Sequence, residues 1–333
     1  MRPFRFHRAA SVDDAVQMCA VTGGHYYAGG TNLLDLMKNG VETPADLIDV
    51  RRLALGEIRE NSDGAVVLGA TATNSAVANH PLVRTRYPML SQAILSGATT
   101  QLRNMATVGG NLMQRTRCPY FMDPAFTACD KRSPGSGCGA RAGLHREHAI
   151  FGADGSCVAV QPSDMAVALR ALDASVHVHG PDGSRVIAVA DFFRLPGDEP
   201  GRDNTLRPGE LITAVVLPPS PFGAHSWYLK VRDRHSYAFA LVSVAAGLEV
   251  VDGVVRSASL AMGGVAARPW RVPAAEALMV GQTPSVATFK AAAQAFMTDA
   301  EPLPQNAFKV DLGYHSVVRA LRTAAVGGGV VSA

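Results

Sequence analysis

The sequence is poor in aromatic residues and in net charge, and it contains no long hydrophobic run. Aromatic side chains make up 6% of the 333 residues, which argues against a base-stacking surface for nucleic acid. The formal net charge is only +3, so the charge balance indicates neither nucleic acid nor an anionic membrane as partner. No segment approaches the roughly 18 apolar residues of a membrane-spanning helix. We therefore expect no nucleic-acid binding and no membrane insertion.

Several signatures of common function classes are also missing. The chain has no G-x-G-x-x-G after its first expected strand, no P-loop, no nucleophile elbow and no zinc-hydrolase helix. The N-terminus, MRPFRFHRAASVDD, lacks the apolar stretch of about 7–15 residues that a secretory signal needs. Taken alone, the chain is expected to fold in the cytoplasm. Export of the folded chain by a signal-bearing partner, with a periplasmic destination, stays open.

The pattern of strands and helices divides the chain into three units. Residues 1–57 read as strand, helix, strand, helix and strand, and Ser11 with Asp14 forms a capping-box signature at the first helix. Residues 58–220 contain an expected hairpin that turns at Pro181 to Gly183. In this second unit we also expect strands at 65–73 and near 210–218, and helices at 88–95 and 162–172.

The third unit spans residues 225–326. Two strands, 240–250 and 254–262, pair around a turn at Asp252–Gly253. Helices follow near 272–280, 285–298 and 314–325, and the tail after them is expected to fray. Strands followed by helices are typical of an α+β layer domain.

Two glycine pairs are the most informative features that are present. They lie in AGGTNLL, Ala28–Leu34, and in TVGGNL, Thr107–Leu112, roughly 80 residues apart. Paired glycines let backbone N–H groups approach a phosphate closely, and Thr31 and Asn32 add side-chain donors at the start of a helix. Two such segments suggest a diphosphate held from both sides. For either segment alone, a ligand-free strand-to-helix turn is the alternative.

Four motifs in a fixed order carry a specific resemblance. They are AGGTNLLDL, GATTQLRNMATVGGNL, PSDMAVAL and LKVRDRHSYAFALVSVAA, followed by GGVAARPWR in the third unit. The chain resembles the FAD-binding (medium) subunit of the molybdenum hydroxylase, or xanthine dehydrogenase, family over nearly its whole length. The resemblance implies an α+β fold. In it, a two-part FAD-binding domain of the vanillyl-alcohol-oxidase/CO-dehydrogenase flavoprotein type precedes a C-terminal α+β domain.

The resemblance also implies which residues contact FAD. The flavin-contact positions of the family correspond to Tyr26, Tyr27, Ala28, Gly29, Gly30, Thr31, Asn32, Leu33 and Leu34, to Thr107, Gly110 and Asn111, and to Asp164, Ile212 and Lys230. Asp164 would lie near the ribityl and adenine side, Ile212 would pack on the isoalloxazine, and Lys230 would lie beside the ring. The alternatives are a helix-start charge for Asp164, plain strand core for Ile212 and a solvated strand position for Lys230.

Four of the five cysteines fall in one segment without regular periodicity, at about 115–160. Cys118, Cys129, Cys138 and Cys157 have the spacing C-x10-C-x8-C-x18-C. Such a segment needs something other than a hydrophobic core to order it. A [4Fe–4S] cluster, a zinc site and two disulfides are the candidates, although the close cysteine pairs usual at zinc sites are absent. His145 and His148 could replace a ligand, but we interpret them as solvated or loop-packing residues.

The cysteine pattern is similar to that of periplasmic-type aldehyde oxidoreductases, whose flavin subunit holds a [4Fe–4S] cluster. This resemblance implies Cys118, Cys129, Cys138 and Cys157 as the cluster ligands. Cys19, in an apolar helix, is expected to be a buried small hydrophobe.

The implied function is electron transfer within a larger complex. A large molybdenum-cofactor subunit would oxidise an aldehyde, and a small [2Fe–2S] subunit would pass electrons to FAD in this chain and on to an external acceptor. No catalytic residue is expected here, because the chain shows no acid–base carboxylate pair of its own. A stand-alone FAD-dependent oxidase and a scaffold subunit without flavin are the alternatives. The sequence leaves the substrate, the acceptor and the role of the [4Fe–4S] cluster open.

Overall fold

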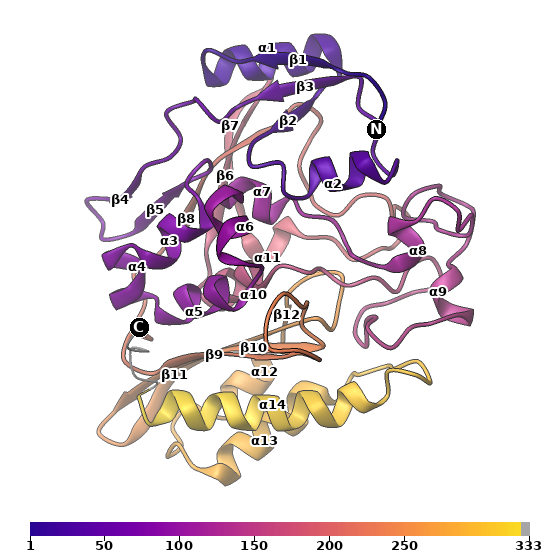
Figure 1. Ribbon diagram of the computed structural model, residues 1–333. Helices are drawn as coiled ribbons and strands as arrows, with labels where there is room; N and C mark the ends of the chain where they lie inside the picture. The colour runs from indigo at the N-terminus through magenta and orange to yellow at the C-terminus, as the bar shows by residue number, and fades with distance from the viewer. Residues whose placement is uncertain (328–333) are drawn as a thin grey trace.

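Three β-sheets follow one another along the molecule (Figure 1). The computed structural model describes residues 1–327, so the tail from residue 328 on, where we expect fraying, lies outside it. The first sheet is parallel, with strand order β1-β3-β2. Its elements are β1 (Arg5–Arg8), α1 (Val12–Thr22), β2 (His25–Tyr27), α2 (Leu33–Lys38) and β3 (Asp46–Asp49), the expected strand and helix order.

The cap of α1 matches the sequence expectation with one difference. Ser11 Oγ accepts a hydrogen bond from the Asp14 N–H at 3.1 Å, as in a capping box. The Asp14 carboxylate, however, accepts from the N–H of Ala10 at 2.7 Å, one residue before the cap. The two contacts fix the chain direction where β1 turns into α1.

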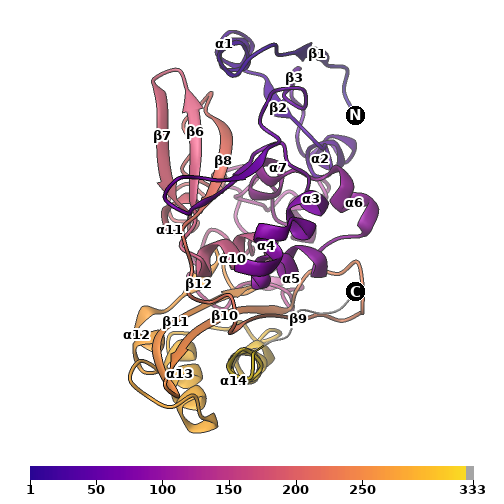
Figure 2. The same ribbon diagram turned by 90° about the vertical axis from the view of Figure 1, so that its left-hand side faces the viewer.

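The second sheet is antiparallel and five-stranded, in the order β4-β5-β8-β6-β7. Its strands are β4 (Ile58–Glu60), β5 (Val66–Gly69), β6 (Ser175–Gly180), β7 (Gly183–Ala188) and β8 (Leu211–Leu217). The β6–β7 hairpin has the predicted turn. Figure 2 shows a group of helices on one side of this sheet, and the largest hydrophobic core lies between them. These helices are α3 (Asn74–Asn79), α4 (Pro81–Arg86), α5 (Pro88–Ser96), α6 (Thr100–Met105), α7 (Val108–Leu112), α10 (Asp164–Ala171) and α11 (Val189–Phe192).

The third sheet is antiparallel, in the order β12-β11-β10-β9. It consists of β9 (Ser226–Val231), β10 (Val242–Val251), β11 (Val254–Gly263) and β12 (Trp270–Arg271). The helices α12 (Pro273–Ala277), α13 (Val286–Met297) and α14 (Phe308–Ala325) cover one face. Strand β9 was not predicted, and α14 begins six residues before the expected residue 314.

Both faces of the third sheet are buried, because α5 and α10 of the second unit pack on the face opposite α14. Glycine residues in the sheet allow the helices to pack this closely. A Cβ added at Gly263 would lie 2.4 Å from Val167 of α10, and one at Gly247 would lie 2.9 Å from Met89 of α5. The second and third units are therefore joined by close packing of helices on a sheet.

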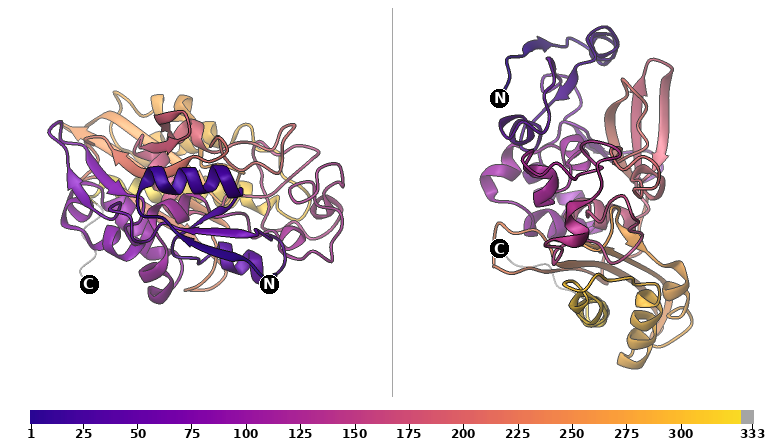
Figure 3. Two further views of the ribbon diagram at one scale, coloured as in Figure 1. Left: turned by 90° about the horizontal axis from the view of Figure 1, so that it is seen from above. Right: turned by 90° about the vertical axis from the view of Figure 1, so that its right-hand side faces the viewer.

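The cysteine-rich segment lies to one side of the sheets (Figures 1 and 3). It contains two short helices, α8 (Pro119–Met122) and α9 (Gly139–Ala142), and an isolated antiparallel bridge between Cys129 and Cys138. Arg132 donates to the carbonyls of Tyr120 and Phe121 at 2.7 and 2.9 Å. These side-chain hydrogen bonds, together with backbone turn hydrogen bonds, give the segment a defined path although its sequence has no period. Across residues 1–327, no helix combines the length and the apolar character needed to cross a bilayer.

Candidate functional site

A cavity of about 380 Å³ opens where the first glycine segment, the second glycine segment and strand β8 meet. This volume is within the range of ligand sites. Of the expected flavin contacts, the lining residues are Tyr26, Ala28, Gly29, Gly30, Thr31, Asn32, Leu33, Thr107, Gly110 and Ile212. The tertiary structure thus brings together three parts of the chain that the sequence analysis associated only through motifs.

The two glycines of the first segment cannot be replaced by a residue with a side chain. A Cβ at Gly29 would lie 2.0 Å from the carbonyl oxygen of Met105, and Gly30 has a φ of +70°, which favours glycine. Tyr27 and Leu34 do not line the cavity; they pack against Gly30 from behind. Within residues 1–327, the N–H groups of residues 29–32 have no protein acceptor. They are therefore free to bind an anion in the cavity.

Asn32 supplies the side-chain donor of this segment. Its Oδ1 accepts from the N–H of Arg115 at 2.8 Å, which orients the amide. Its Nδ2 is buried, and among the described residues it has no hydrogen-bond partner. A buried amide donor without a partner costs about 1–3 kcal/mol, so this position is suited to a ligand acceptor such as a phosphate oxygen.

The second glycine segment differs from the first in its backbone. It forms the short helix α7, and Thr107 Oγ1 accepts from the N–H of Gly110 at 3.2 Å. The N–H of Gly109 donates to the carbonyl of Ala70 at 2.9 Å. Asn111 faces away from the cavity and accepts from Ser163 Oγ at 2.5 Å. The two segments therefore differ: the first offers free N–H groups, and the second packs closely beside them.

Asp164 and Lys230 lie together, outside the cavity of the glycine segments. Lys230 Nζ on β9 is 2.7 Å from Asp164 Oδ2 on α10, and Tyr228 Oη donates to Asp164 Oδ1 at 2.7 Å. The Lys230 and Asp164 side chains are only 3% and 10% exposed. Lys230 is therefore not the solvated residue of the alternative interpretation, whereas Asp164 is the first residue of α10, as its helix-start alternative expects. Burial, and then the negative charge of Asp164, raises the pKa of Tyr228 well above its ordinary value.

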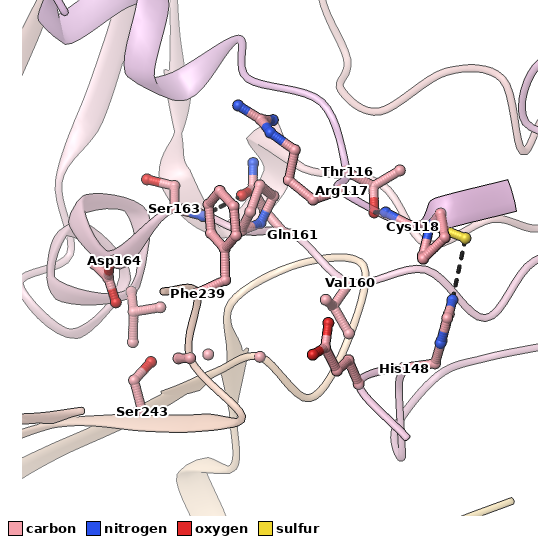
Figure 4. A pocket seen from close by; sticks show the side chains of 17 residues that line it. Thr116, Arg117, Cys118, His148, Val160, Gln161, Ser163, Asp164, Phe239 and Ser243 are labelled. Atoms are coloured by element: carbon pink, nitrogen blue, oxygen red, sulfur yellow. Dashed lines mark hydrogen bonds between the residues drawn. The ribbon is translucent and has the colours of Figure 1, made fainter. Parts of the chain in front are cut away.

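A smaller cavity runs from Asp164 toward Cys118 (Figure 4). Its walls include Arg117, Ser163 and Phe239, and the Arg117 guanidinium lies 5.2 Å from the centre of the Phe239 ring. Burial lowers the pKa of Arg117. The passage connects the neighbourhood of the Asp164–Lys230 pair with the cysteine-rich segment.

All four cysteines of that segment line one small cavity between α8, the 129–138 bridge and residues 156–159. They are free thiols, as is Cys19, so the disulfide alternative does not describe this structure. Burial raises the pKa of Cys118 to about 12 and that of Cys157 to about 11. Such buried thiols stay protonated unless a metal offsets the thiolate charge.

The arrangement of the four cysteines around this cavity differs from the ligand arrangement that a single metal ion needs. In the described part of the chain, no three His, Cys, Asp or Glu side chains are grouped as the ligands of one metal ion. A zinc ion needs its four ligands around a single point. An iron–sulfur cluster binds its four thiolates at separate iron atoms, so it suits cysteines that surround a cavity.

His145 and His148 are both buried, which corrects the solvated alternative for these residues. His148 Nε2 lies 3.1 Å from Cys118 Sγ (Figure 4), and its main-chain carbonyl accepts from Lys309 Nζ. Burial lowers the pKa of His148 to about 4, so the ring is neutral near pH 7. Both histidines pack the segment onto the third unit.

Comparison with known proteins identifies the family. The family of the FAD binding domain in molybdopterin dehydrogenase matches residues 2–220, and that of the CO dehydrogenase flavoprotein C-terminal domain matches residues 227–324. The chain belongs to the molybdopterin dehydrogenase FAD-binding family. Its fold is therefore the α+β arrangement that the sequence predicted: an FAD-binding domain of the CO dehydrogenase flavoprotein type followed by the C-terminal domain of that flavoprotein.

Two relatives show how far the likeness extends. The chain is 46% identical to the aldehyde oxidoreductase FAD-binding subunit PaoB of Escherichia coli (strain K12), over 97% of this chain and 99% of that protein. It is 27% identical to the carbon monoxide dehydrogenase medium chain of Afipia carboxidovorans, over 84% of this chain and 80% of that one.

Solved structures share the fold. CO dehydrogenase from Oligotropha carboxidovorans superimposes with a TM-score of 0.76 at 24% identity, covering 98% of this chain and 100% of that chain. Quinoline 2-oxidoreductase from Pseudomonas putida 86 also gives a TM-score of 0.76, at 23% identity and 98% coverage of both chains.

A group of charged residues beside the cavity of the glycine segments was not predicted from the sequence. Arg115 and Glu42 line the cavity and form an ion pair, and Arg115 also pairs with Asp203, which in turn pairs with Lys131. Arg115 and Lys131 belong to the cysteine-rich segment, whereas Glu42 and Asp203 come from distant parts of the chain. Only the folded chain shows that the four charges meet.

Proposed function

We propose that this chain is the FAD-binding electron-transfer subunit of a multi-subunit, molybdenum-dependent aldehyde oxidoreductase. The 46% identity to an aldehyde oxidoreductase FAD-binding subunit over nearly the whole of both chains supports this function. The observation in the fold that carries it is that, among residues 1–327, neither Nδ2 of Asn32 nor the N–H groups of residues 29–32 beside it have a hydrogen-bond partner. These donors suit the diphosphate of a dinucleotide.

The residues present fit FAD in three ways. Residues 29–32 would donate to the diphosphate, and Ile212, which is 4% exposed, would pack on the flavin ring. Lys230, held by Asp164 outside this cavity, would place a positive charge near the ring. Thr107 and Gly110 would line the diphosphate side, and Asn111 would support it from outside the cavity through its hydrogen bond with Ser163. When bound, FAD accepts and donates electrons singly or in pairs. The protein's contribution is to bind the cofactor, orient it and fix the charge around it.

We also propose that the cysteine cavity holds a [4Fe–4S] cluster. Cys118, Cys129, Cys138 and Cys157 supply four thiols around one space, and Lys131 adds a positive charge near Cys157. A cluster would also explain how the segment between residues 115 and 160 keeps its path with little hydrophobic core of its own.

The partners would be a large molybdenum-cofactor subunit, a small [2Fe–2S] subunit and an external electron acceptor. We place the unit boundaries at 1–57, 58–220 and 225–326, and we propose that the assembled complex is exported to the periplasm by a partner that bears the signal. The names of the related proteins, a FAD-binding subunit and a medium chain, support a place in such an assembly.

The proposal is tested with two preparations. In one the full chain is purified alone, and in the other it is co-expressed and purified with the two partner subunits. The chain alone should carry one FAD and oxidise no aldehyde, and the complex should oxidise aldehydes with an artificial acceptor. Aldehyde oxidation by the isolated chain would instead favour a stand-alone oxidase. A folded chain that binds no FAD would favour a scaffold.

A further inference from the structure

Arg115 connects the first glycine segment to the start of the cysteine-rich segment. It lies three residues before Cys118, and its backbone N–H holds Oδ1 of Asn32 at 2.8 Å. Its guanidinium lines the cavity, where it pairs with Glu42 and donates to the Gly201 carbonyl at 2.9 Å. The direction of the unpartnered Asn32 amide therefore depends on where Arg115 is held.

Lys131 connects the same network to the cysteines. It lies two residues after Cys129, lines the cysteine cavity and is only 6% exposed. Its Nζ donates to the Pro200 carbonyl at 2.8 Å and to Asp203 Oδ1 at 2.5 Å. Lys131 does not line the cavity of the glycine segments.

Asp203 joins these two cations. Its Oδ2 accepts from Arg115 Nε at 2.8 Å while its Oδ1 accepts from Lys131 Nζ. Burial alone would raise the pKa of Asp203, but the charges of Lys131 and Arg115 outweigh burial and hold the pKa below its ordinary value. With Glu42, the four side chains balance two positive charges against two negative ones. Lys131 is buried and the other three side chains are partly buried, so removing one partner leaves a poorly solvated charge without its counter-charge.

We propose that Asp203 is a positioning residue that couples the order of the cysteine-rich segment to nucleotide binding by the first glycine segment. The inference rests on the proposed FAD function. When Lys131 is fixed by an ordered cysteine cavity, Asp203 is fixed too, and Arg115 then holds Asn32 in the orientation that binds the diphosphate. Because coupling between two sites is reciprocal, bound FAD must in turn stabilise the cysteine-rich segment.

The test uses the full chain and Asp203→Asn, which keeps the shape of the side chain and removes its charge. The expected result is a rise of roughly tenfold in the Kd for FAD, measured by fluorescence titration of the flavin-depleted chain, or about 1.4 kcal/mol. The matched control is Asp233→Asn, which removes the exposed Arg146–Asp233 pair (2.8 Å) at the other end of the same segment. The control should bind FAD like the native chain.

A second measurement separates coupling from simple loss of structure. In the chain freed of any bound metal, saturating FAD should slow the alkylation of the four segment cysteines several-fold in the native sequence and in Asp233→Asn, but not in Asp203→Asn. A merely structural role for Asp203 would lower the melting temperature and leave this FAD dependence intact, which would overturn the coupling.

The remaining outcomes are also decisive. A native Kd for FAD in folded Asp203→Asn overturns the proposal. If Asp203→Asn does not fold, Lys131→Met decides, because an unchanged FAD affinity in that variant shows that the cysteine side has no influence on the cavity. A native chain that binds no FAD at all contradicts the proposed function rather than the coupling.

Discussion

Lys230 on β9 and Asp164 on α10 form a buried ion pair, with 2.7 Å between Nζ and Oδ2. The two residues lie 66 positions apart, in the C-terminal domain and the FAD-binding domain of the family. Tyr228 adds a hydrogen bond to the same carboxylate. The positive charge proposed to lie beside the flavin is therefore fixed in place across the boundary between two domains.

Lys230→Ala should lower the reduction potential of the bound flavin. The change removes a cation that favours the reduced, anionic ring and leaves Asp164 unbalanced nearby. A loss of about 1.4 kcal/mol corresponds to about 30 mV for a two-electron couple. Spectroelectrochemical titration measures it, with exposed Lys290→Ala as the control. A potential equal to that of the native chain, with flavin still bound, would remove this role from Lys230.

Asn32→Ala should weaken FAD binding roughly tenfold, since a hydrogen bond to a charged acceptor contributes about 1.5–3 kcal/mol. Asn39→Ala is the matched control, because Asn39 lies exposed at the other end of the same helix, α2. Equilibrium titration of the flavin-depleted chain gives both constants. If the two variants bind FAD equally well, the buried Nδ2 of Asn32 does not contact the diphosphate.

The native chain, purified without oxygen, should contain about four irons and absorb broadly in the blue part of the visible spectrum. Cys129→Ser should lose most of this iron, because Cys129 lines the shared cavity. Cys19→Ser should keep it, because Cys19 lies in α1 and lines the other cavity. Iron at the background of a flavin-only protein, or one zinc per chain, would contradict the [4Fe–4S] assignment.

Lys309 should make folding stability depend on pH. Its Nζ is buried among the carbonyls of Glu147, His148 and Gly264, and burial lowers its pKa to about 7 from 10.5. Below pH 7 the buried lysine is charged in the folded state, and this charge destabilises the fold. Between pH 7 and the unfolded-state pKa the folded state loses the proton while the unfolded state keeps it. The free energy of unfolding therefore increases by about 3 kcal/mol between pH 7 and pH 10.

Lys309→Met should flatten that rise, while Lys290→Met, at an exposed position, should retain it. Urea unfolding at several pH values measures the difference between the two variants. Parallel pH profiles for both would show that Lys309 does not change its protonation in this range.

Much of the fold could be predicted because its signals are local. Ser11 and Ser163 begin helices through their own hydroxyl groups, and Gly183 completes the hairpin turn through its positive φ. Strand β9 and the start of α14 could not be predicted, because Lys230 and Lys309 interrupt the apolar pattern there. Both lysines can be buried only because residues from elsewhere in the chain accept hydrogen bonds from their ammonium groups.

The sequence by itself determined the family and the free donors of the first glycine segment, since motif order and backbone freedom are properties of contiguous residues. Only the tertiary structure decided that Asp164 meets Lys230 and that Asp203 joins Arg115 to Lys131. A buried charge must find its counter-charge in space, and the partner it finds can lie at any distance along the chain.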